Sequence, residues 1–201
     1  EELGLPYELK VLPFPPRVLQ KDYLDTNPLG TIPLFLDGAS RLTESAAICQ
    51  YLAVKHSPRA LNVEPDEPGF ADYLNFLHFG EATLTFPQTL LLRYGQFEPP
   101  ERRQPQVVDD YGKWFLARLR TLQPRLEAAP YLAAGRFTAA DVSVGYALLL
   151  AGILKLSARF TPAVAEYWQR LQQRQGLQRA LQRQEQAARE QGVAAAPLGG
   201  G

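Results

Sequence analysis

Apolar and polar positions over residues 27–52 follow first the period of strands and then the period of a helix. Asn-Pro followed by Gly marks a loop, and residues 32–36 form a short apolar run that stops at Asp-Gly, a dipeptide favoured in two-residue hairpins. A second short strand leads to Glu44 and Ser45, after which apolar residues recur at helical spacing. Ser45 is placed to cap that helix. The stretch predicts a β-hairpin followed directly by a helix.

The residues before this hairpin predict a further strand and a short helix. Residues 7–12 alternate between apolar and polar as a strand does, and Pro13 ends the run. Residues 17–24 carry apolar side chains at the spacing of a short helix.

The first residues have the pattern of a helix that is ending. Leu3 is followed by Gly4 and then by Pro6, the signals of a helix C-terminus. We therefore expect the natural protein to begin earlier, with one more strand and most of a helix, on the order of 15–20 residues from average element lengths. The expected order is then βαβαββα, an α/β domain of thioredoxin-like topology truncated at its start. A small α+β domain of another topology is the alternative.

The second half of the chain predicts helices only. Residues 58–69 hold three prolines and several acids and predict a linker. Long helices follow over 70–94, bent or broken at Pro87, over 108–126 and over 139–154, with further helices after Pro162 and over 176–190. The expected organisation is an incomplete thioredoxin-like domain at 1–57, the linker at 58–69, an all-helical bundle at 70–192 and a flexible tail at 193–201.

The helix expected over 139–154 has the clearest start. Thr138 and Asp141 fit a capping box, and Phe137 and Val142 are spaced as a hydrophobic staple. Apolar residues surround this segment on nearly all sides, which is typical of a central, buried helix.

Composition narrows the function classes. Of 201 residues 46% are hydrophobic, and Lys plus Arg equals Asp plus Glu at 21 each, so the net charge is zero. This balance gives no electrostatic footprint for nucleic acid or an anionic membrane. A single cysteine excludes an internal disulfide framework, so we expect a reducing cytoplasm and a buried, structural thiol at Cys49. Two histidines, without a Cys/His cluster, predict no metal site.

The hairpin and helix, with Ile32-Pro33 before the first strand and Glu44-Ser45 before the helix, resemble the glutathione-binding half of the glutathione S-transferases. The capping box resembles the start of the core helix in their all-α domain, so the resemblance extends over nearly the whole chain. It implies an enzyme that conjugates the thiol of glutathione, as co-substrate, to a small apolar electrophile. It also implies a homodimer. The catalytic Ser, Tyr or Cys of the family would precede Glu1, so we name no catalytic residue here.

The resemblance implies that Ile32, Pro33, Glu44 and Ser45 bind glutathione. A cis bond before Pro33 would turn the backbone N–H and C=O of Ile32 toward the cysteinyl part of the ligand. Ser45, at a helix N-terminus, would hold the γ-glutamyl carboxylate, and Glu44 would accept from the ammonium group. Taken alone, each pair has an ordinary interpretation: a trans proline that begins a strand, and a serine cap beside an acid.

A polar stripe on the first long helix is a candidate for the substrate pocket. His78, Glu81, Thr85 and Gln88 recur at spacings of three and four, between apolar neighbours, and the first three are the pocket candidates. Such a stripe faces either water or a cleft that holds few polar groups.

The sequence also departs from the family pattern. Gly30 and Thr31 stand where many members have a His or Lys, and Ala46 stands where an Arg often follows the acidic-Ser pair. Fewer side chains are thus available for the carboxylates of glutathione. Two other functions stay open: a non-catalytic interaction module of the same fold, and a glutathione-dependent thiol transferase or reductase with a Cys in the preceding strand.

Overall fold

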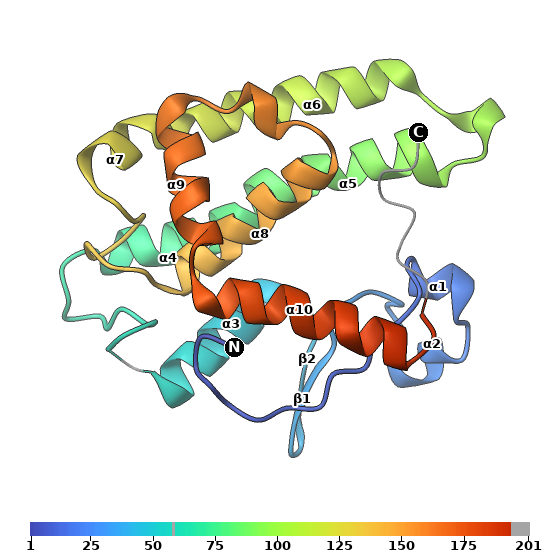
Figure 1. Ribbon diagram of the computed structural model, residues 1–201, viewed down its shortest axis with the longest axis horizontal. Coiled ribbons are helices and arrows are strands. Elements are labelled where there is room, and N and C mark those ends of the chain that lie inside the picture. Colours follow the sequence, from blue (N-terminus) through green and yellow to red (C-terminus); the bar gives the residue numbers. More distant parts are fainter. Residues whose placement is uncertain (58, 194–201) are drawn as a thin grey trace. The chain divides into compact units, whose positions relative to one another are not determined.

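The computed structural model describes residues 1–57 and 59–193 and divides into two compact units (Figure 1). The first unit joins residues 1–48 with the chain from Leu171 onward, and the second comprises Cys49–Arg170. The C-terminal helix therefore packs with the N-terminal residues, which the sequence did not predict. The domain boundary at 58–69 stays a prediction, and of the tail at 193–201 only Val193 lies among the described residues.

The first unit is built around the predicted hairpin. Strands β1 (Phe35–Asp37) and β2 (Ser40–Leu42) pair antiparallel, with Phe35 opposite Leu42. The turn contains Gly38 at φ +58°, a conformation that glycine adopts readily. Helix α3 (Ser45–His56) begins directly after β2 and continues into the second unit.

The strand predicted at 7–12 is wrong, because no strand pairs with these residues. Their backbone is bound instead by the side-chain amide of Gln191: its Nε2 donates to the carbonyl of Leu9 at 2.8 Å, and its Oε1 accepts from the N–H of Val11 at 2.9 Å. An alternating pattern becomes a strand only where a neighbouring strand supplies its hydrogen bonds.

The short helix predicted over 17–24 forms as two single turns, α1 (Pro16–Leu19) and α2 (Tyr23–Thr26). The side chains of Val18 and Leu19 are exposed, and Tyr23 is buried. Because Pro16 is the one buried residue of α1, no continuous apolar face stabilises a longer helix, and α1 ends after one turn.

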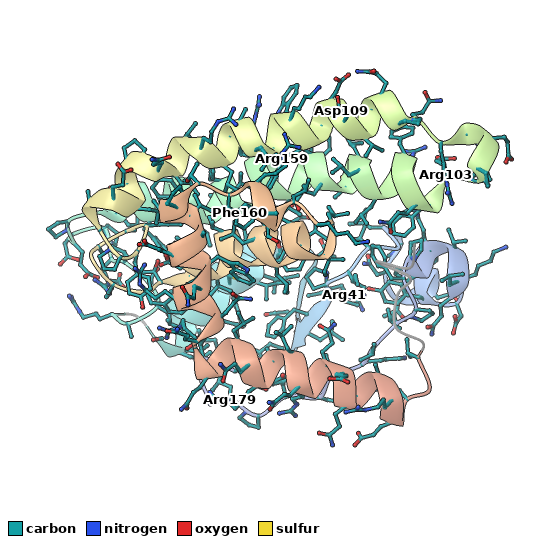
Figure 2. The ribbon with its side chains drawn as sticks, turned by 45° about the horizontal axis from the view of Figure 1, so that its top comes forward. Arg41, Arg103, Asp109, Arg159, Phe160 and Arg179 are labelled. Atoms are coloured by element: carbon teal, nitrogen blue, oxygen red, sulfur yellow. The ribbon has the colours of Figure 1, made fainter. Side chains whose placement is uncertain are left out.

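The C-terminal helix α10 (Gln175–Glu190) lies beside the N-terminal segment of the chain, as Figure 1 shows in red and dark blue. Arg179 projects from this helix (Figure 2) and donates to the backbone carbonyl of Glu1 at 3.0 Å. Arg183 donates to the carbonyl of Tyr7 at 2.8 Å and lies over its ring. The helix is amphipathic, and two arginines on its polar face bind the backbone of Glu1 and Tyr7.

The second unit is helical, as predicted. Helix α8 packs against α4 and the following π-helical segment, and α5 packs against α6. Its elements after α3 are α4 (Phe70–His78), η1 (Phe79–Thr85), α5 (Phe86–Leu92), η2 (Arg93–Phe97), η3 (Pro100–Arg102), α6 (Pro105–Leu119), η4 (Arg120–Leu122), α7 (Gln123–Ala128), α8 (Ala139–Ile153), η5 (Ser157–Arg159) and α9 (Pro162–Gln172).

The interruption expected at Pro87 is a π-helical segment that precedes the proline. Pro87 lacks an N–H and crowds the carbonyl four residues earlier, so the preceding turn, η1, widens. Gly80 lies within this segment against α8: a Cβ there would be 2.4 Å from the Oγ of Ser143. The hydroxyl of Ser143 donates to the carbonyl of Leu77 at 2.7 Å, which fastens the two helices together.

The predicted capping box at the start of α8 is confirmed. The N–H of Thr138 donates to Oδ2 of Asp141 at 2.9 Å. The other carboxylate oxygen accepts from the hydroxyl of Tyr167 at 2.8 Å and from the N–H of Leu132 at 3.1 Å. Burial raises the pKa of the Asp141 carboxyl, and these donors oppose the shift. The carboxylate thus connects the start of α8 to α9 and to the loop that precedes α8.

Helix α8 is buried on one side rather than all round, which corrects the prediction. Val142, Tyr146 and Ile153 are exposed within their unit, and Tyr146 is 56% exposed. Within the described part of the chain, no helix is both long and apolar enough to cross a membrane.

Candidate functional site

The hairpin brings the two predicted binding pairs to one end of the sheet. Phe35 is paired with Leu42. Ile32 lies three residues before Phe35, and Ser45 lies three residues after Leu42. In an antiparallel pair, positions equally far outside the last paired residues lie at the same end. The candidate site therefore belongs entirely to the first unit.

Ile32 presents free backbone groups at this end. The bond between Ile32 and Pro33 is cis, as predicted, and Ile32 is 45% exposed. Among the hydrogen bonds of residues 1–57 and 59–193, none involves the backbone N–H or C=O of Ile32. An exposed backbone edge of this kind can pair with an extended peptide ligand.

The start of α3 supplies a positive pole beside this edge. The carbonyl of Glu44 accepts from the N–H of Ile48 at 2.9 Å, so Glu44 occupies the N-cap and Ser45 is the first helical residue. This corrects the prediction that Ser45 is the cap. The N–H groups of Ser45 and the next two residues then have no helical acceptor and favour an anion.

The side chains of this pair differ in exposure. Glu44 is exposed and accepts from the hydroxyl of Thr43 at 3.3 Å. Ser45 is half-buried, and its hydroxyl forms no hydrogen bond within the part of the chain that the structure describes. A hydroxyl donor and a carboxylate acceptor are thus next to each other at one helix end, a combination that suits a zwitterionic group.

Sequence reasoning missed two residues that shape the loop before Ile32. Asn27 and Tyr23 are buried, at 2% and 8% exposure. Both donate to the carbonyl of Thr31, Asn27 through Nδ2 at 2.9 Å and Tyr23 through its hydroxyl at 2.8 Å. The only sequence signal was Asn-Pro, which marks a turn and says nothing of where the Asn side chain goes.

The three substrate-pocket candidates lie on or beside the π-helical segment. His78 is exposed, and Glu81 and Thr85 are half-buried. Since a π-helix turns less per residue than an α-helix, residues three apart, such as His78 and Glu81, no longer share a face across η1. The hydroxyl of Thr85 donates to the carbonyl of Gly80 at 2.9 Å. The pocket role of these residues stays a prediction.

Burial disfavours Cys49 as a nucleophile. Burial raises the pKa of its thiol to about 11, so the nucleophilic thiolate is scarce at neutral pH. Within the described residues, no group of three or more His, Cys, Asp and Glu side chains is placed to hold a metal ion.

Comparison with known proteins finds relatives among the glutathione S-transferases. The family model described as "Glutathione S-transferase, N-terminal domain" matches residues 1–55. Glutathione S-transferase GstA of Escherichia coli O157:H7 is 30% identical over 168 residues, which cover 80% of this chain and 77% of that protein. Glutathione S-transferase 3 of Schizosaccharomyces pombe is 36% identical over 84 residues, and this match spans only 35% of that relative.

Solved structures show the same fold. The glutathione transferase URE2P6 from Phanerochaete chrysosporium, in complex with oxidized glutathione, superposes with a TM-score of 0.79 at 25% identity, over 92% of this chain and 88% of that one. BphK, a bacterial GST in a ternary complex, gives 0.77 at 26% identity, over 92% and 90%. The predicted fold class is confirmed: a thioredoxin-like region with few strands followed by a mostly helical domain.

Proposed function

Because the chain belongs to the glutathione S-transferase family, we propose that glutathione binds across the open end of the hairpin. The cysteinyl part pairs with the backbone of Ile32 beside Pro33, as an added strand would. The γ-glutamyl carboxylate binds the hydroxyl of Ser45 and the free N–H groups of α3, and its ammonium group binds Glu44. The single observation that carries the proposal is the register of β1 and β2, which sets these groups at one end of the sheet.

The proposed reaction is conjugation. The thiolate of glutathione attacks an apolar electrophile, a carbon–sulfur bond forms, and the leaving group departs with the displaced electron pair. The thiol proton goes to solvent. His78, Glu81 and Thr85 are the proposed contacts for the electrophile. We also propose a homodimer in the cytoplasm, because two-fold dimers are the commonest oligomers and an unpaired cysteine suits a reducing compartment.

Calorimetric titration of the full chain with glutathione tests the proposal. Ser45→Ala removes one hydroxyl from the site, and we expect it to raise the Kd for glutathione about 3–10-fold, the usual range for one hydrogen bond. Ser157→Ala removes an exposed hydroxyl from the second unit and should leave the Kd unchanged. Absence of binding by the unsubstituted chain would overturn the proposal.

A non-catalytic interaction module is the second candidate. It is favoured by Gly30, Thr31 and Ala46, because these residues offer fewer side-chain contacts to the carboxylates of glutathione than the family pattern does. Glutathione binding without conjugation of 1-chloro-2,4-dinitrobenzene would support this candidate. Cys49 would not serve a thiol transferase, because burial raises the pKa of its thiol.

A further inference from the structure

The carbonyl of Thr31 is the most firmly held backbone group of the loop before the binding edge. It accepts two hydrogen bonds, from the hydroxyl of Tyr23 at 2.8 Å and from Nδ2 of Asn27 at 2.9 Å. The same Nδ2 also donates to the oxygen of Tyr23 at 3.3 Å, which closes a triangle of three polar groups. Two buried side chains therefore fix the orientation of one peptide plane.

That peptide plane also carries the N–H of Ile32. The Thr31–Ile32 bond is not among the cis bonds of the chain, so it is trans. In a trans peptide the C=O and the following N–H point in opposite directions. When Tyr23 and Asn27 hold the Thr31 carbonyl inward, they direct the N–H of Ile32 away from the buried triangle.

Other contacts keep Asn27 in place. Its backbone N–H donates to the carbonyl of Tyr23 at 2.8 Å, its Oδ1 accepts from the N–H of Leu29 at 3.2 Å, and its carbonyl accepts from the N–H of Gly30 at 2.8 Å. Gly30 has φ +61°, and a Cβ there would lie 2.6 Å from the Cβ of Arg17. The loop is thus closely packed against α1 and has little freedom to turn the Thr31–Ile32 peptide.

We propose that Tyr23 and Asn27 are positioning residues that aim the Ile32 N–H at the cysteinyl carbonyl of glutathione; this inference rests on the proposed function. Neither side chain touches the ligand itself. They act through the one peptide that joins Thr31 to Ile32, and without them this peptide rotates and the ligand loses a backbone hydrogen bond.

Two variants separate this role from a general effect on folding. Tyr23→Phe removes only the hydroxyl, and Asn27→Asp keeps the acceptor for Leu29 but places an oxygen against the Thr31 carbonyl. We expect the Kd and the KM for glutathione to rise about 3–10-fold in Tyr23→Phe and tenfold or more in Asn27→Asp. The kcat of both should stay within about twofold of the unsubstituted value. The matched control is Tyr111→Phe, which removes the hydroxyl of a ring stacked on Trp114 in the second unit. It should leave Kd, KM and kcat unchanged.

The amide of Ile32 gives a direct readout. In ¹⁵N-labelled protein, its NMR signal should shift when glutathione is added, and the shift should saturate at higher glutathione concentration in Tyr23→Phe. A lower Tm in both variants with unchanged Kd and an unchanged Ile32 titration would show a merely structural role and overturn this inference alone. No binding of glutathione by the unsubstituted chain would overturn the proposed function and this inference together.

Discussion

The guanidinium of Arg174 holds the carboxylate of Glu2 through two hydrogen bonds, Nε to Oε1 at 2.8 Å and Nη2 to Oε2 at 2.9 Å. The two residues are 172 positions apart, and both side chains are more than two-thirds buried. Gly176 allows this approach, because a Cβ there would be 2.4 Å from the Cδ of Glu2. The pair fastens the start of the chain to the start of α10.

Replacing Arg174 by Lys should lower the free energy of unfolding by about 1 kcal/mol, because an ammonium group cannot form the bidentate hydrogen bond of a guanidinium with a carboxylate. Urea denaturation measures this difference in the free energy of unfolding. The difference should decrease as the NaCl concentration is raised, since salt screens the ion pair. Arg189→Lys is the control on the same helix: its pair with Glu185 is mostly exposed, and we expect no measurable change. Equal effects of the two substitutions would contradict the assigned role of Arg174.

Gly80→Ala should destabilise the second unit. The new methyl group would lie 2.4 Å from the Oγ of Ser143 and 2.5 Å from its backbone carbon, so α8 has to move away from η1. We expect the free energy of unfolding to fall by about 1–3 kcal/mol, the usual range for overpacking.

Gly112→Ala provides the comparison for this helix–helix contact. Gly112 lies within α6, and a Cβ there would meet nothing closer than the Cδ2 of Leu91 at 3.8 Å. Alanine restricts the unfolded chain and suits a helix, so this variant should be neutral or stabilising by up to about 1 kcal/mol. Thermal and urea unfolding measure both variants, and a stable Gly80→Ala protein would argue against the close packing of η1 on α8.

The thiol of Cys49 should be slow to react. Burial raises its pKa from 9.0 to about 11, which lowers the thiolate fraction at pH 8 about 100-fold. The alkylation rate with iodoacetamide should fall by at least that factor relative to the chain in guanidinium chloride. Rapid alkylation of the folded chain would show that the thiol is accessible and ionised.

The same raised pKa of Cys49 makes stability depend on pH. The folded chain keeps the thiol proton between about pH 9 and pH 11, where the unfolded chain loses it. The stabilisation that the protonated thiol contributes is therefore fully present below pH 9 and is lost as the pH rises through about 11. In Cys49→Ala no thiol titrates at this position. The free energy of unfolding of this variant should therefore fall less between pH 8 and pH 11 than that of the unsubstituted chain.

Glu44→Gln tests the acidic half of the proposed site. The substitution keeps the size of the side chain and removes the charge that would meet the ammonium group of glutathione. Because Glu44 is exposed, we expect only a modest rise in Kd, about 2–5-fold at low salt and less at high salt. Glu101→Gln, an exposed acid in the second unit, is the control. An unchanged Kd with Glu44→Gln would remove the ammonium contact from the proposal.

Local sequence signals were enough at the hairpin turn and at the start of α8. Asp-Gly predicts the turn between β1 and β2, which the structure contains. Thr138 and Asp141 predict the start of α8, three residues apart. Ile32 and Ser45 lie at the same end of the sheet for the same reason, since one tight turn and a two-strand register join them.

The tertiary structure decided everything that depends on distant residues. Alternation at 7–12 predicts a strand, but the groups that bind this backbone belong to Gln191, some 180 residues away. The sequence predicts only a bend or break at Pro87, and the structure shows a π-helical segment, η1, that lies against Ser143. Backbone groups need hydrogen-bond partners, and a sequence names those partners only when they are close along the chain.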